Sequence, residues 1–154
     1  MNSYPDTSLK GQLVGKQIRE VFIAIQHSYG EEDNAFRDLI KFVPYVGDSV
    51  VYVAFGDCCS ITWISDVLGI SSLIGGHVRD VRGDDSEQIT EEDYDTIAHY
   101  SYQILTDKGE CSLLYKNMSN GYYGGSLDFM DEEPKDVEWR SLTGDYSDNR
   151  EHLA

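Results

Sequence analysis

The residues with the clearest chemical potential are two adjacent cysteines that follow an aspartate, Asp57-Cys58-Cys59. A cysteine attacks a substrate or binds a metal as its thiolate, and this needs a neighbouring cation or helix N-terminus to lower the thiol pKa. Asp57 has the opposite effect, because a nearby negative charge raises the pKa of a thiol. Adjacent strand residues also point to opposite faces, and zinc sites favour a Cys-x-x-Cys spacing. The pattern favours structural cysteines and leaves a thiol- or metal-dependent enzyme around these residues as an alternative.

The histidines show no spacing that is typical of a metal or catalytic site. No H-x-H or HExxH pattern occurs, so a metal site would need His77 and His99 to converge with Asp57 and Cys58 in space. Gly121 to Gly125 is rich in glycine but lacks the lysine of a phosphate-binding loop. We therefore expect no catalytic residues, no bound metal and no cofactor.

Charge is the strongest compositional feature. The 154 residues include 28 acids and 12 bases, a net charge of −16. This argues against direct binding to nucleic acid or to an anionic membrane, since both attract Lys and Arg. The acids concentrate after residue 82, first in the run 84–95 and again from Asp128 onward. We expect the first run and its tyrosine to bind a partner protein: Asp84, Asp85, Glu87, Glu91, Glu92, Asp93 and Tyr94.

The 11 tyrosines also favour a protein-binding face, and a pocket for a small ligand is the alternative kind of site. A protein that binds a small ligand or nucleotide derivative would need a pocket with aromatic and polar side chains. The residues that fit such a pocket are Asp57, Cys58, Trp63, Asn120 and Tyr122.

The sequence predicts a cytoplasmic protein. The apolar runs Val21–Ile25 and Val50–Phe55 are far shorter than the ~18 residues of a membrane-spanning helix. Residues 1–11 contain no apolar segment typical of a signal peptide. Three cysteines, two of them adjacent, make a poor disulfide framework and indicate free thiols in a reducing compartment.

Strand patterns dominate the chain. Runs rich in β-branched and aromatic residues predict strands at 18–25, 39–43, 50–55, 60–64, 77–81 and 97–105. Helical turns are expected within 65–74 and from Thr90, and a short helix around Trp139 and Leu142. Gly47-Asp48 predicts one hairpin, and Asn120-Gly121 predicts another between 111–115 and 122–129. The fold class is α+β: a mainly antiparallel, curved β-sheet with one or two short helices.

The same patterns divide the chain into three parts. Residues 1–11 are expected to be a flexible lead-in, 12–130 a single α+β domain, and 131–154 an acidic, partly ordered tail. Exposed edge strands would also permit a homodimer.

Two motifs carry a resemblance to a known family. Gly56-Asp57-Cys58-Cys59-Ser60 and Ser119-Asn120-Gly121-Tyr122-Tyr123, in this order, resemble an uncharacterised domain family of bacteriophages, notably those of actinobacteria, and of some bacteria. Many members have an acidic residue after the cysteines, where this chain has Ser60. The resemblance implies a phage or prophage setting, inside an infected or lysogenic bacterial host, and implies no reaction.

These observations favour a non-catalytic acidic accessory protein. Its expected partner is a host or phage protein with a basic surface. The Lys and Arg side chains of that surface would attract the carboxylates of this chain as they attract the phosphates of DNA. Such masking of a nucleic-acid-binding surface, as in host takeover by a DNA mimic, is the leading hypothesis.

Overall fold

The computed structural model describes residues 6–27, 36–56, 60–83, 88–92, 95–119 and 124–150. The side chains of residues 27, 36, 88–92 and 95 are outside this description. Within these ranges, no helix has the length and apolar character required to cross a bilayer.

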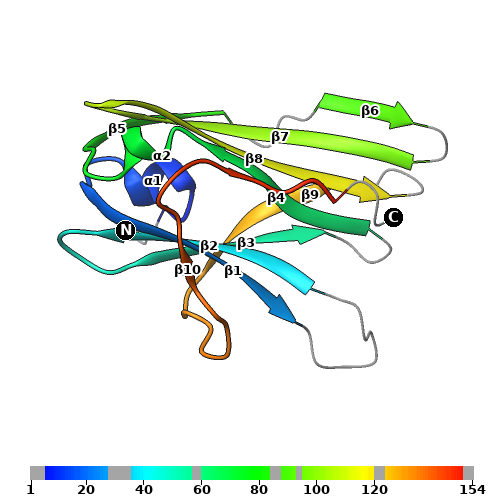
Figure 1. The fold of residues 1–154 in the computed structure, drawn as a ribbon, viewed down its shortest axis with the longest axis horizontal. Coiled ribbons are helices and arrows are strands. Elements are labelled where there is room, and N and C mark those ends of the chain that lie inside the picture. Colours follow the sequence, from blue (N-terminus) through cyan, green and yellow to red (C-terminus); the bar gives the residue numbers. More distant parts are fainter. Residues whose placement is uncertain are drawn as a thin grey trace, which may run out of the picture.

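The described strands form two antiparallel sheets packed face to face (Figure 1). The first sheet has the order β10-β1-β2-β3-β9, and the second has the order β11-β4-β8-β7-β5, with β6 also pairing with β7. The first sheet contains β1 (Ile18–His27), β2 (Phe36–Pro44), β3 (Val50–Gly56), β9 (Gly125–Met130) and β10 (Arg140–Ser141). The second contains β4 (Ser60–Leu68), β5 (Val78–Arg82), β6 (Gln88–Glu92), β7 (Asp95–Thr106), β8 (Gly109–Ser119) and β11 (Tyr146–Ser147).

Two short helices close one end of the space between the sheets (Figure 1). They are α1 (Leu9–Leu13) and α2 (Ile70–Leu73), and each buries its first and last residue in the main core. Ser8 caps α1, because its hydroxyl accepts a hydrogen bond from the Gly11 amide at 3.0 Å. α1 begins at Leu9, which lies within the segment expected to be a flexible lead-in.

Alternating patterns account for the strands that face the core. Along β8, Cys111, Leu113 and Tyr115 are fully buried, while Ser112 and Leu114 between them are half-buried. β3 is buried on both faces from Val50 to Ala54. The outer face of β3 is buried because Met130, Val137 and Trp139 pack against it and against the outer faces of β1 and β2.

The expected mainly antiparallel fold with short helices is therefore confirmed at the level of two open sheets and two helices. The Gly47-Asp48 hairpin is also confirmed, since β2 and β3 are antiparallel neighbours.

The prediction of a hairpin at Asn120-Gly121 is wrong. β8 pairs with β4 and β7, whereas β9 pairs with β3 in the other sheet. The chain between β8 and β9 therefore passes from one sheet to the other. A local turn signal does not specify which strand will accept the next segment, because sheet partners are selected by long-range packing.

Of the three expected helical segments, one is confirmed and two are wrong. α2 (Ile70–Leu73) is the helical turn expected within 65–74, and it is short because β4 continues to Leu68. The segment at Thr90 is the strand β6, paired with β7. Arg140–Ser141 and Tyr146–Ser147 are strands that pair with β1 and β4, where a helix around Trp139 and Leu142 was expected. Pairing with an open sheet edge outweighs weak local helix propensity in these short segments.

Candidate functional site

A hollow of about 680 Å³ lies between the N-terminal segment and the end of β9. Its lining includes three carboxylates and three aromatic rings, and we call these six residues the acidic hollow: Asp6, Tyr52, Tyr102, Asp128, Phe129 and Asp131. No Lys, Arg or His occurs among the described residues that line it. The hollow therefore presents negative charge beside aromatic surface.

The floor of the acidic hollow is fixed by Tyr52. Its side chain is buried in β3, and its ring meets Phe129 edge-on at 5.7 Å between centroids. The Tyr52 hydroxyl donates to the carbonyl oxygen of Thr7 at 2.9 Å and so ties the N-terminal segment to the sheet. Burial, together with Tyr102 and Asp6, raises the pKa of Tyr52 well above its usual range, so this hydroxyl stays protonated.

Asp6 is held in place as a carboxylate at the rim. Its Oδ1 accepts hydrogen bonds from the hydroxyl and the backbone amide of Ser8. These bonds lower the pKa of Asp6. A Cβ at Gly11 would lie 2.2 Å from Asp6 Cγ, so the glycine allows the carboxylate to rest over α1.

A second hollow, of about 330 Å³, adjoins the first. It shares Phe129 and Asp131 with the acidic hollow and adds Asp48, Glu133 and one base, Lys16. The end of β9 and the turn after it therefore contribute carboxylates to both hollows.

A different kind of site lies at the end of the sandwich opposite the helices (Figure 1). There Ser60 pairs with Ser119 across β4 and β8, and Gly56 pairs with Gly125 across β3 and β9. These four residues flank 57–59 and 120–124, so the two motif-bearing connections leave from neighbouring strand ends.

Small polar side chains replace apolar ones inside this end. We call the group Ser60, Thr62, Asn117 and Ser119 the polar end. Asn117 Nδ2 donates to Thr62 Oγ1 at 2.8 Å and to Ser60 Oγ at 3.1 Å. Ser119 is 4% exposed, and its hydroxyl finds no hydrogen-bond partner within the described part of the chain.

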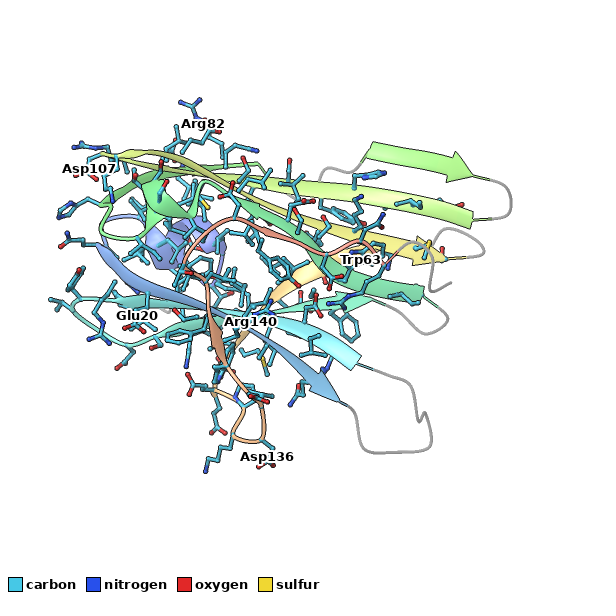
Figure 2. The ribbon with its side chains drawn as sticks, in the orientation of Figure 1. Glu20, Trp63, Arg82, Asp107, Asp136 and Arg140 are labelled. Carbon is cyan, nitrogen blue, oxygen red and sulfur yellow. The ribbon has the colours of Figure 1, made fainter. Side chains whose placement is uncertain are left out.

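The structure tests few of the residues singled out from the sequence. Of the expected ligand pocket only Trp63 is described; it is fully buried against Ile97 and Met118, and its Nε1 donates to the Asp148 carbonyl oxygen at 2.9 Å. Figure 2 shows it beside the C-terminal segment. Asp57, Cys58, Cys59, Asn120 and Tyr122 lie outside the described residues.

The expected partner-binding run is described only in its backbone and only in part. Glu91 and Glu92 belong to β6, opposite Thr96 and Asp95 of β7. Asp84, Asp85, Glu87, Asp93 and Tyr94 lie outside the described residues.

The structure does not bring His77 and His99 together. His77 Nδ1 lies 3.2 Å from Asp107 Oδ2, beyond the end of β7, while His99 lies in that strand opposite Lys116. At about 3.4 Å per residue the two histidines are roughly 25 Å apart. Among the described side chains, no three of His, Cys, Asp or Glu gather as metal ligands. Cys111 is a buried free thiol, and burial raises its pKa to about 12.

Sequence reasoning missed the acidic hollow. Its members come from the N-terminal segment, β3, β7, β9 and Asp131 just after β9, which only the tertiary fold brings together. A local signal existed in Asp128-Phe129-Met130-Asp131, where two acids flank two apolar residues at the end of β9.

Together, these features define a small antiparallel two-sheet domain with a helix-closed apolar end, a polar end and an acidic hollow. A family model described as a domain of unknown function (DUF7448) matches residues 11–129, and the chain belongs to this family. No curated protein and no solved structure matches the chain.

Proposed function

We propose that the protein is a non-catalytic acidic accessory protein that binds a basic surface of a host or phage protein. The acidic hollow carries this proposal. Three carboxylates beside the partly exposed rings of Tyr102 and Phe129 suit a lysine or arginine side chain, which gains both charge pairing and contact with a ring face. The net charge of −16 would steer a basic partner toward the molecule.

In this proposal the protein acts in the cytoplasm of an infected or lysogenic bacterium. Masking of a nucleic-acid-binding surface, as by a DNA mimic, is the form of inhibition that the charge favours. The run 84–95 would add a second acidic contact, with Asp84, Asp85, Glu91, Glu92, Asp93 and Tyr94 as the residues to change first.

Affinity capture from a lysate of the bacterial host tests the proposal. The hollow variant Asp6→Asn/Asp128→Asn/Asp131→Asn is compared with a matched control, Glu110→Gln/Asp136→Asn/Glu138→Gln. The control removes the same formal charge from exposed positions outside the hollow. Figure 2 shows Asp136 at the tip of an outlying loop.

We expect wild type and control to capture one stoichiometric partner at low salt and to lose it at high salt. The hollow variant should lose the partner under both conditions. Equal capture by all three proteins would contradict a role for the hollow, and charge reversal in the run 84–95 would then test the second acidic contact separately.

One observation favours a second candidate, a small-ligand or nucleotide-derivative binding protein. A buried hydroxyl without a hydrogen-bond partner costs about 1–3 kcal/mol of folding free energy. The Ser119 hydroxyl at the polar end is buried and has no such partner among the described residues. A ligand hydroxyl or carbonyl would offset that cost. The surrounding Ser60, Thr62 and Asn117 are uncharged, which suits a neutral ligand such as a nucleoside.

Thermal shift with uridine and adenosine tests this candidate in wild type, Ser119→Ala and the control Ser112→Ala on the same strand. Without ligand, Ser119→Ala should be as stable as wild type or more stable. A nucleoside should raise the Tm of wild type and control but not of Ser119→Ala. No shift with either nucleoside in wild type would reject the nucleoside form of this candidate.

A further inference from the structure

The C-terminal segment 131–150 wraps around the domain as a strap (orange to red in Figure 1). It first covers the outer face of the first sheet, where Val137 and Trp139 pack against Ala24, Leu39 and Val53. It then forms β10 on the edge of β1, crosses to the second sheet and forms β11 on the edge of β4. One continuous segment thus connects the edges of both sheets.

The strap lies beyond the matched family domain. The match ends at residue 129, and the strap begins two residues later. It contains seven acids and three bases, so it carries net negative charge of its own. Its strands β10 and β11 have two residues each, whereas β7 and β8 have 12 and 11. The strap is therefore paired far less extensively than the sheets that it joins.

Most of its polar attachments are near the surface. Glu133 forms an ion pair with Lys41 at 2.9 Å, and the Lys41 ammonium lies 4.4 Å from the centre of the Trp139 ring. Asp145 Oδ1 accepts hydrogen bonds from the amides of Gly69 and Ile70 and so caps α2. Glu133 and the Gly69 amide bond are exposed, and exposed contacts contribute little individually, whereas the Lys41 side chain is only 12% exposed and makes the strongest of these attachments.

The distal end is held differently, by a buried ionic group. Arg150 Nη1 donates to Asp38 Oδ1 of β2 at 2.8 Å, and Arg150 Nε donates to Asp148 Oδ2 at 2.8 Å. Asp38 Oδ2 also accepts from the Ile64 amide of β4 at 2.9 Å. One arginine therefore fixes the strap at the point where β2 and β4 of the two sheets meet.

We propose that residues 131–150 form a releasable strap that opens as a unit while both sheets stay folded, with Arg150 as its lock. Opening uncovers Trp63 and the edges of β1 and β4. Because Asp131 is both the first strap residue and part of the acidic hollow, opening also alters the hollow. This last link rests on the proposed function, whereas the opening itself does not.

Native-state hydrogen exchange of the full chain tests the opening. The strap amides of Leu142 and Asp148 donate to Val21 and Ser65 and report on strap release. Amides of β7 and β8 report on global unfolding. We expect the strap amides to exchange at least about tenfold faster than the slowest β7–β8 amides. Equal exchange, with the same dependence on denaturant, would show that the strap unfolds only with the whole domain and would overturn the proposal.

The lock is tested with Arg150→Gln and with Lys135→Gln, which removes an exposed base from the same strap. Arg150→Gln should speed exchange at Leu142 and Asp148 by at least about tenfold and leave β7–β8 unchanged. Lys135→Gln should change neither. Uniform acceleration in Arg150→Gln would contradict a local lock, and the wild-type measurement still decides the proposal if this variant fails to fold.

Tryptophan fluorescence gives an independent readout, because both tryptophans of the chain contact the strap or belong to it. In a Trp139→Phe background, emission from Trp63 should move to longer wavelength when Arg150→Gln is added. Unchanged Trp63 emission in folded Arg150→Gln would count against release.

The Asp6→Asn/Asp128→Asn/Asp131→Asn variant separates the two proposals. It should lose capture of the partner, while the amides of Leu142 and Asp148 should exchange at the wild-type rate.

Discussion

Asp38 illustrates how one buried carboxylate joins distant parts of the chain. It is fully buried in β2, yet both of its oxygens accept hydrogen bonds, one from Arg150 and one from the Ile64 amide. Removal from water raises the pKa of Asp38, and this effect outweighs the opposing influence of Arg150 and of the amide. An acid next to the apolar run 39–43 is visible in the sequence, but its partner 112 positions away is not.

The raised pKa gives a pH-dependence with a defined sign. Folding favours the protonated form of Asp38, so its contribution to stability is complete below the unfolded-state pKa of 3.8 and is lost as pH rises through the folded-state pKa. Relative to wild type, Asp38→Asn should therefore become less destabilised as pH rises above about pH 4. Urea unfolding of both proteins at a series of rising pH values measures the difference. A shift in the opposite direction would show that Arg150 overcompensates the burial of Asp38.

At the scale of elements, the polar end depends on close contact between the two sheets. Gly56 and Gly125 face Thr62 and Asn117, and a Cβ at Gly56 would lie 2.2 Å from Thr62 Oγ1 and 2.8 Å from Asn117 Nδ2. No real side chain tolerates such distances, so β3 and β4 would have to move apart. Glycine is required at Gly56 because of what lies opposite it and not because of its backbone conformation.

Gly56→Ala should therefore destabilise the fold by about 1–3 kcal/mol or more through overpacking. Gly144→Ala is the matched control, since a Cβ there would have nothing within 4 Å. It should change the free energy of unfolding by less than about 1 kcal/mol. Urea denaturation of both variants compares them. Equal stability of the two variants would mean that the sheets separate readily at this end.

At the scale of the whole molecule, the net charge of −16 opposes folding through self-repulsion. Salt screens this repulsion, with a Debye length that falls from about 30 Å at 0.01 M to about 3 Å at 1 M. Raising NaCl from about 0.01 M to about 0.5 M should raise the Tm by several degrees, since about 1 kcal/mol corresponds to roughly 2–4 °C at this chain length.

The Glu110→Gln/Asp136→Asn/Glu138→Gln variant is the control for this prediction. It carries less charge of the same sign, so its Tm should rise less with salt. Differential scanning calorimetry of both proteins measures the effect. An identical rise in the two proteins would assign the salt effect to general solvent changes instead of charge repulsion.

The sequence by itself determined most of the longer strands and the sign of the charge, but not the short strands β6, β10 and β11. Regions such as 18–25 and 97–105 are correctly placed because alternating or β-branched runs record which face is buried, a local property. Only the tertiary structure decided which strands share a sheet, that the chain passes between sheets after Ser119, and that Asp6, Asp128 and Asp131 meet in one hollow. These outcomes depend on contacts between residues far apart in the chain, and no local pattern encodes which partner wins that competition.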